Sequence, residues 1–369
     1  MNINQATADF EKWLGDQLIA QGGLDTAALK LKHKAMKEEG AHAFLRATFY
    51  RWAELWLAQE SETPKVLAVG DIHVENFGTW RDGEGRLVWG VNDFDEGCEL
   101  PYTSDLVRLG VSACFAIREL QDFETSMADA CELILRGYTE AIGGAATPFV
   151  LAEDHTDLTR LAQGTFLAAP VEKFWKKRLK KTQPATAIPS AARKLLEDSL
   201  PEGSTHIEFR EPVPDDPPGL GSRGKRRFYA FALWRGARVL REVKPVMPLA
   251  VTWASRTSVA PRLEELLQSP NRCPDSTQQV RDGWIVRRLA PDAIKIELSD
   301  LTGSRATQAE EEKLFESMGA ELAHLHAGSG QDKAIMEDLH RRLGQNKGWF
   351  DSATKAWAET VEKDRQEFS

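Results

Sequence analysis

Two short apolar segments, each followed at once by acidic side chains, constrain this chain more than any other feature. The segment VLAVG at residues 66–70 follows Pro64, which ends a helical pattern, and it reads as a buried strand leading into the loop GDIHVENFG. A second strand at residues 87–91 leads into the loop NDFDE at residues 92–96. We therefore expect two polar loops to lie close together at the ends of two strands.

The first loop carries an aspartate, Asp71, with an asparagine, Asn76, five residues later. This is the spacing of a kinase catalytic loop, in which the aspartate accepts the proton of the attacking hydroxyl and the asparagine binds a metal ion. His73 lies between them and is expected to support the loop by hydrogen bonding. The alternative is a polar turn at the end of a strand, where Asp and Asn are common for local reasons.

The second loop offers the carboxylates of Asp93 and Asp95 at the end of the next strand. Together with the amide oxygen of Asn76, they form the set of hard oxygen ligands that Mg²⁺ prefers. An acidic surface turn is the alternative for either loop taken alone, but two such loops about twenty residues apart favour a site. Whether Asp95 or Glu96 joins Asp93 at the metal stays open.

A glycine-rich run, Gly219-Leu-Gly221-Ser222-Arg-Gly224, follows a proline-rich loop and precedes the strand pattern FYAFAL. A dinucleotide-binding fold would need a strand before the run and a helix after it. The observed context instead favours a glycine-rich loop that covers phosphates between two strands, with Gly219, Gly221, Ser222 and Gly224 near the nucleotide. Arg226 and Arg227, directly after it, are expected to be solvated strand ends.

Lys244 lies late in the strand pattern VLREVKPV, twenty residues beyond Gly224. A strand lysine at this place in kinases contacts the nucleotide phosphates and pairs with a glutamate on a helix. The helix pattern PRLEELLQ supplies that glutamate as Glu264 or Glu265. The alternatives are a lysine that extends to solvent and a solvated helix.

Set side by side, GDIHVEN and VNDFDE resemble the H-G-D-x-H-x-x-N and I-D-F/W-x-D/E motifs of aminoglycoside and choline phosphotransferases. SDLVRL at residues 104–109 and ELAHLHA at residues 321–327 resemble two helices of the same superfamily. The order of all these motifs resembles a bacterial family of unknown function with kinase-like motifs. The resemblance covers roughly residues 40–330, and it places the glycine-rich run after the catalytic loop instead of before it.

The resemblance implies an α+β, two-lobed protein-kinase-like fold that is circularly permuted. A large helical catalytic lobe would comprise residues 1–200 and be completed by helices at 301–369, and a small β-rich nucleotide lobe would comprise residues 201–300. It also implies that Asp71 is the catalytic base, that Asn76 and Asp93 bind the metal, and that Lys244 contacts phosphate. The adenine would lie near the strand at residues 285–289.

The implied activity is transfer of the γ-phosphoryl group of ATP, with Mg²⁺, to a hydroxyl of an unidentified small-molecule or protein acceptor. Val69, Asn92 and Pro245 depart from the phosphotransferase motifs. They keep open a pseudokinase that only binds nucleotide and a kinase-like protein that transfers a nucleotidyl group. A metallophosphoesterase is a lesser alternative. VLAVGDIH has the apolar strand and the D-x-H motif with which such sites begin, but the further metal-binding motifs are absent from the sequence.

Composition gives weaker limits on partners and location. The net charge of −9 gives no reason to expect nucleic acid or an anionic membrane as a partner. The four cysteines form no C-x-x-C pair, and the first residues do not resemble a signal peptide, so a reducing cytoplasm is expected. The basic run KFWKKRLKK at 173–181 reads as the solvated face of a helix anchored by Phe174, Trp175 and Leu179, or as a docking surface for an acidic substrate.

Overall fold

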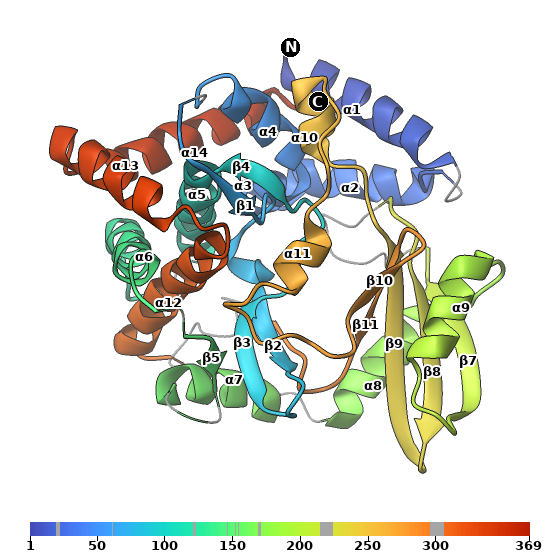
Figure 1. The fold of residues 1–369 in the computed structure, drawn as a ribbon. Coiled ribbons are helices and arrows are strands. Elements are labelled where there is room, and N and C mark those ends of the chain that lie inside the picture. Colours follow the sequence, from blue (N-terminus) through green and yellow to red (C-terminus); the bar gives the residue numbers. More distant parts are fainter. Residues whose placement is uncertain are drawn as a thin grey trace.

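Helices from both ends of the chain pack together in the computed structural model, and the largest β-sheet stands beside them (Figure 1). The structure describes residues 1–19, 23–60, 62–120, 123–145, 147–151, 153, 155–168, 171–214, 224–295 and 306–369. The mixed α+β class expected from the sequence is confirmed. None of the described helices is both long and apolar enough to cross a membrane.

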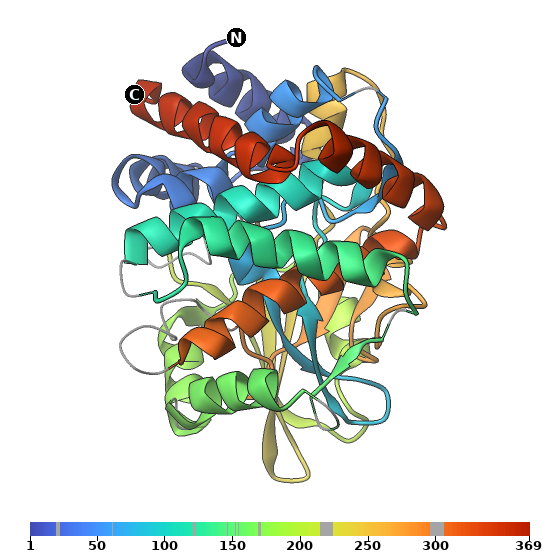
Figure 2. The same cartoon turned by 90° about the vertical axis from the view of Figure 1, so that its left-hand side faces the viewer.

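The helical part is built from the two ends of the chain and the segment between the small sheets. Its helices are α1 (Ile3–Gln17), α2 (Thr26–Glu38), α3 (Ala41–Ala47), α4 (Phe49–Leu57), α5 (Tyr102–Leu120), α6 (Met127–Ile142), α7 (Thr156–Ala168), α12 (Gln308–Ala327), α13 (Asp332–Gln345) and α14 (Trp349–Glu367). Two of them, α6 and α12, pack closely side by side (Figure 2). A Cβ on Gly137 would collide with the carbonyl of Glu316, so glycine permits this approach.

Two small antiparallel sheets lie against the helices and carry the acidic loops. Strand β1 (Lys65–Ala68) pairs with β4 (Cys98–Pro101), and β3 (Leu87–Val91) pairs with both β2 (Phe77–Arg81) and β5 (Phe149–Val150). The two strands expected from the apolar segments are thus confirmed. A 3-10 turn, η2 (Val74–Asn76), connects the first loop to β2.

The largest sheet has six strands, and all neighbouring pairs in it are antiparallel. Its order is β10-β11-β9-β8-β7-β6. The strands are β6 (Thr182–Pro184), β7 (Thr205–Pro212), β8 (Phe228–Trp234), β9 (Ala237–Pro245), β10 (Gln279–Arg281) and β11 (Trp284–Arg288). The sheet therefore begins before the boundary expected at residue 201.

Two helices cover opposite faces of this sheet. Helix α9 (Ser190–Ser199) packs Leu195 against Val243, while α8 (Val171–Lys180) packs Trp175 against Leu240. Because side chains alternate along a strand, Lys244 lies on the same face of β9 as Leu240. The basic run is thus the helix α8, anchored by Trp175, but the prediction for Leu179 was wrong because that side chain is exposed.

The segment after β9 leaves the sheet and returns to the helical part. It forms the short helices α10 (Ala250–Ser255) and α11 (Leu263–Leu267), and α10 packs on α4. The two ends of the chain also meet there: the side chain of Asn4 donates to the backbone of Glu367 (3.0 Å) and accepts from the Ser369 amide (3.0 Å). Figures 1 and 2 show both termini on the same side of the helices.

Candidate active site

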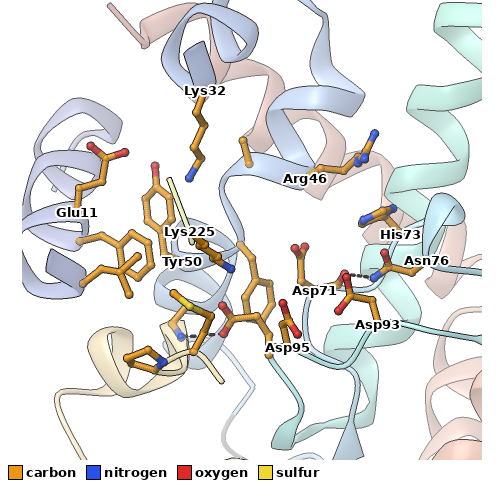
Figure 3. A pocket seen from close by; sticks show the side chains of 18 of the residues that line it. Glu11, Lys32, Arg46, Tyr50, Asp71, His73, Asn76, Asp93, Asp95 and Lys225 are labelled. Atoms are coloured by element: carbon orange, nitrogen blue, oxygen red, sulfur yellow. Dashed lines mark hydrogen bonds between the residues drawn. The ribbon is translucent and has the colours of Figure 1, made fainter. Parts of the chain in front are cut away.

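A cavity of about 110 Å³ lies where the two acidic loops meet helices α1, α2 and α4 (Figure 3). The structure brings together five of the residues expected at a site. These are Asp71, His73, Asn76, Asp93 and Asp95. Four basic side chains line the same cavity, namely Lys32, Arg46, Lys225 and Lys295.

The backbone before Asp71 is held by a carboxylate on α5. The backbone amides of Val69 and Gly70 donate to the two carboxylate oxygens of Asp105, at 2.6 and 3.0 Å. His326 on α12 approaches the same carboxylate, with 3.3 Å between its Nε2 and Oδ2 of Asp105. The segments SDLVRL and ELAHLHA therefore meet at the end of β1 and fix the direction in which the chain enters the loop.

Asp71 itself forms an ion pair with Arg108 from the next turn of α5. The distance between Oδ1 and Nη2 is 2.5 Å, and the same nitrogen donates to the carbonyl of Leu45 at 2.8 Å. Arg108 has no exposed surface, whereas the side chain of Asp71 keeps 25 % of its surface exposed. Burial raises the pKa of Asp71 above its ordinary value, although the charge of Arg108 opposes this shift. Asp71 is thus a carboxylate of increased basicity at an accessible position.

Asn76 connects the two loops through its backbone and side chain. Its side-chain nitrogen Nδ2 donates to the backbone carbonyl of Asp71 (2.7 Å). Its backbone carbonyl accepts from the backbone amide of Asn92 (2.9 Å). The side-chain oxygen of Asn76 is therefore the atom left to act as a ligand. His73 caps η2 by accepting from the amide of Glu75 (3.2 Å), and burial holds its pKa well below the ordinary value. A neutral, structural histidine agrees with its expected supporting role.

Lys244 reaches the second loop from the large sheet. Its ammonium lies 3.1 Å from Oδ1 of Asp93 and 2.6 Å from Oδ1 of Asp95. Burial opposes ionisation of Asp93, but the charges of Lys244, Arg287 and Lys295 outweigh burial and hold its pKa below the usual range. The lysine and the aspartates lie about 150 residues apart in sequence, so this contact fixes the sheet against the acidic loop.

The structure does not bring the expected glutamate to Lys244. Glu264 is exposed on α11, and Glu265 pairs with Arg262 at 2.5 Å. Within the described part of the chain, the ion-pair partners of Lys244 are the loop aspartates. The helix expected from PRLEELLQ is short and comprises only Leu263–Leu267. Its buried side chains are Leu263 and Leu266.

The glycine-rich run falls partly outside the described residues, which exclude Gly219, Gly221 and Ser222. Its last glycine, Gly224, accepts from the amide of Asp25 at the start of α2 (3.0 Å). Gly224 has a φ of 89°, a conformation that favours glycine. Because Lys225 lines the cavity, the end of the run lies at the site.

A second charged cluster lies on the sheet beside Lys244. The buried Glu242 pairs with Arg227 (2.6 Å) and with Arg287 (2.6 Å). The expectation of a solvated Arg227 was wrong, since its side chain is 9 % exposed. The charge of Arg287 also helps to keep Asp93 ionised, as noted above. Sequence reasoning could not find this cluster, because it depends on the pairing of β8, β9 and β11.

Lys32 is the least expected side chain in the cavity. It lies on α2 in the sequence KLKHKAMK, a pattern typical of a solvated helix, yet it is only 8 % exposed. Burial lowers its pKa to about 8, and the charge of Lys225 acts in the same direction, while Glu11, Asp71 and Glu96 oppose the shift. A lysine in this state costs folding free energy at neutral pH.

We expect the Lys32→Met variant to be more stable than the wild type at pH 7.5 by about 3 kcal/mol, the value of a shift from 10.5 to about 8. Between pH 8 and 10.5 the unfolded chain binds more protons at this lysine, so the stability of the wild type should rise toward that of the variant. Urea unfolding of both proteins at pH 7.5 and 9.5 measures this difference. A gap that stays constant with pH would contradict a buried charged lysine.

The side chains at the cavity include oxygen donors of the type that Mg²⁺ prefers. No group of three or more His, Cys, Asp or Glu side chains is arranged to hold a metal ion in the ranges that the structure describes. The oxygen donors at the cavity include the amide oxygen of Asn76 and the carboxylates of Asp93 and Asp95. Mg²⁺ commonly takes one or two protein carboxylates and completes its shell with water and phosphate, so this set is chemically sufficient.

Comparison with known proteins relates about half of the chain to a family. No curated protein and no solved structure matches the sequence. Residues 24–205, which are 182 of the 369 residues, match the family described as "Uncharacterized protein conserved in bacteria (DUF2252)". The match includes Asp71, Asp93 and Arg108 and ends before Lys244. The region that contains both acidic loops is therefore similar to this family of uncharacterized bacterial proteins.

Proposed function

We propose that this protein is an ATP- and Mg²⁺-dependent phosphotransferase with a circularly permuted protein-kinase-like architecture. The observation that carries the proposal is the position of Lys244. It reaches from a strand of the large sheet to Asp93 and Asp95, beside the loop of Asp71 and Asn76. A strand lysine, a metal-binding carboxylate and an Asp-x₄-Asn loop are the parts that phosphoryl transfer requires in kinases.

The meeting of the chain ends supports the permuted order. Asn4 and Glu367 are joined by a hydrogen bond. The first helix, α1, and the last helix, α14, contact each other. Joining the ends there and cutting the chain elsewhere would leave the packing of both parts unchanged. The late position of the glycine-rich run and Lys244 in the sequence is thus compatible with a kinase-like site.

Each residue has a chemical role in the proposed reaction. Asp71, whose pKa burial raises, accepts the proton of the acceptor hydroxyl while that oxygen bonds to the γ-phosphorus. The bond from the γ-phosphorus to the bridging oxygen breaks, and ADP leaves with that electron pair. Asn76, Asp93 and Asp95 would hold Mg²⁺, which when bound offsets negative charge on the phosphates. Lys244 is placed to exchange part of its contact with the aspartates for a phosphate oxygen.

The size of the cavity limits where the nucleotide lies. Small-molecule sites usually measure roughly 300–1,000 Å³, whereas this cavity measures about 110 Å³. It is large enough for the reacting phosphoryl group and not for a whole nucleotide. The adenosine must therefore extend out of the cavity toward the large sheet, or the sheet must move away from the helical part when ATP binds.

Calorimetric titration with a non-hydrolysable ATP analogue, with and without Mg²⁺, tests the proposal. Binding should be stronger with Mg²⁺, and Lys244→Ala should weaken it about 10-fold or more, as expected for the loss of a charge-assisted hydrogen bond. Asp93→Ala should remove the dependence on Mg²⁺. The exposed Lys333 supplies a control, because Lys333→Ala should bind as the wild type does.

The outcome also separates the alternatives. The absence of nucleotide binding by the folded wild type would overturn the proposal and favour another chemistry of the carboxylates. Binding without any turnover would favour a nucleotide-binding pseudokinase, and release of pyrophosphate in place of ADP would favour nucleotidyl transfer. A metallophosphoesterase has less support, because the sequence lacks the further metal-binding motifs of that class.

A further inference from the structure

The cavity contains a buried cationic side chain that forms no direct ion pair with any of the described residues. Lys32 points into the cavity from α2 (Figure 3). It is 8 % exposed, and it forms no hydrogen bond or ion pair with any residue in the described ranges. Its ammonium lies over the ring of Tyr50, 5.7 Å from the ring centroid. A buried ammonium normally has a partner, because transfer from water costs several kcal/mol.

The acidic groups nearest to Lys32 are already engaged. Glu11 pairs with His33 on α2 at 2.8 Å. Glu96 accepts from the backbone amide of Ala250 at 2.8 Å. These carboxyl groups therefore have other partners and form no ion pair with Lys32.

The other charged neighbours of Lys32 are a carboxylate that already has a partner and a second ammonium group. Asp71 is paired with Arg108 at 2.5 Å, so its charge is shared with a buried guanidinium. Lys225 lines the same cavity and disfavours the charged form of Lys32. Two ammonium groups therefore face one cavity beside the proposed catalytic base, and this arrangement is suited to an anion.

The position of Lys32 relative to the metal-binding carboxylates indicates which ligand that anion belongs to. In the view of Figure 3, Asp71 lies between Lys32 and the pair Asp93 and Asp95. In the proposed reaction the nucleotide phosphates approach Lys244 and the aspartates. The part of the cavity next to Lys32 and Lys225 is then left for the acceptor.

We propose that the phosphoryl acceptor is a small hydroxyl compound with a phosphate or carboxylate group, and that Lys32 and Lys225 bind this group. This inference rests on the proposed function, and it names the substrate class of that site. The anion supplies a direct ion-pair partner and holds the hydroxyl beside Asp71. Apolar side chains such as Leu14 and Leu29 also line this cavity, and a less polar lining strengthens the charge interaction.

Titration of the full chain with inorganic phosphate, and separately with acetate, tests the proposal by calorimetry at pH 8. The wild type should bind at least one of these anions, and the stronger of the two identifies the chemistry of the group. Lys32→Gln should weaken binding at least 10-fold, and Lys32→Arg should retain more of it. Lys30→Gln is the matched control, because Lys30 is exposed on the same helix and should leave binding within twofold.

Proton uptake provides a second measurement that a purely structural lysine would not change. Because the pKa of the free Lys32 is about 8, binding of an anion should raise it and take up protons at pH 8. Calorimetry in two buffers with different ionisation enthalpies measures this uptake. We expect it in the wild type and in Lys30→Gln, and we expect it to be lost in Lys32→Gln.

The same titrations in the presence of the ATP analogue and Mg²⁺ separate this inference from the proposed function. Anion binding that persists with the analogue supports an acceptor site, whereas competition with the analogue would overturn it. Equal binding by wild type and Lys32→Gln, or no anion binding by folded wild type, would also overturn it. Lys32-dependent anion binding without any binding of nucleotide would contradict the phosphotransferase and leave the anion site standing.

Discussion

Turnover of ATP should fall by about 10²–10⁴-fold when Asp71 is replaced with asparagine, the range that a positioned general base contributes. The asparagine keeps the size of the side chain and can still accept a hydrogen bond from Arg108, but it cannot take the proton of the acceptor. Release of ADP from ATP and Mg²⁺ is the measurement, with water and with anionic hydroxyl compounds as acceptors. Binding of the ATP analogue should remain close to that of the wild type.

The exposed Asp16 provides the control for this substitution. Asp16→Asn makes the same chemical change away from the cavity and should leave turnover unchanged. Circular dichroism at the assay temperature should confirm that Asp71→Asn is folded, because this change also leaves the charge of Arg108 uncompensated. Full turnover by folded Asp71→Asn would exclude Asp71 as the base, even if nucleotide binding were shown.

The sequence predicted the two acidic loops well because their signals are local. An apolar run before Asp71 and another before Asp93 indicate strands, and a strand end restricts where the next side chains can lie. The proximity of the two loops followed from their spacing. The structure adds the backbone link between Asn76 and Asn92, which no residue pattern indicates.

The partner of Lys244 shows where prediction from the sequence ended. A strand lysine and a helical glutamate were both present, but the pairing depends on how α11 sits against the sheet. In the structure Glu264 faces solvent, and Asp93 and Asp95 take its place. The pattern therefore predicted the lysine and not its contact, because contacts between distant segments are set by tertiary packing.

Buried charges were the other features that the sequence did not reveal. Helical periodicity assigns lysine and arginine to the solvent face by default, so Lys32 and Arg108 were not expected in the interior. Both are compatible with their helices only because specific groups surround them, such as Phe49 and Trp52, whose rings lie 5.1 and 5.2 Å from the guanidinium of Arg108. Such surroundings come from segments that are distant in the sequence and have no signature within one segment.

Arg108→Met should destabilise the fold by about 3–5 kcal/mol, the usual cost of removing one partner of a buried ion pair. Arg108 has no exposed surface, and its removal leaves Asp71 without a counter-charge and the carbonyl of Leu45 without a donor. Urea unfolding at pH 7 measures the loss. Arg281→Met is the control, because Arg281 pairs with Asp198 at the surface and should change stability by less than about 0.5 kcal/mol.

A double-mutant cycle with Asp71→Asn tests whether the pair itself carries this cost. Each single change leaves a charge without its partner, whereas the double variant has neither charge. Its destabilisation should therefore be smaller than the sum of the two single values by about 1–3 kcal/mol. Additive losses would contradict the pairing of Asp71 with Arg108.

Two nitrogens of Arg108, Nε and Nη1, are buried without a hydrogen-bond partner, so the pair is costly to bury even when intact. If the double variant is nearly as stable as the wild type and has no turnover, the pair is retained for its effect on Asp71 and not for stability.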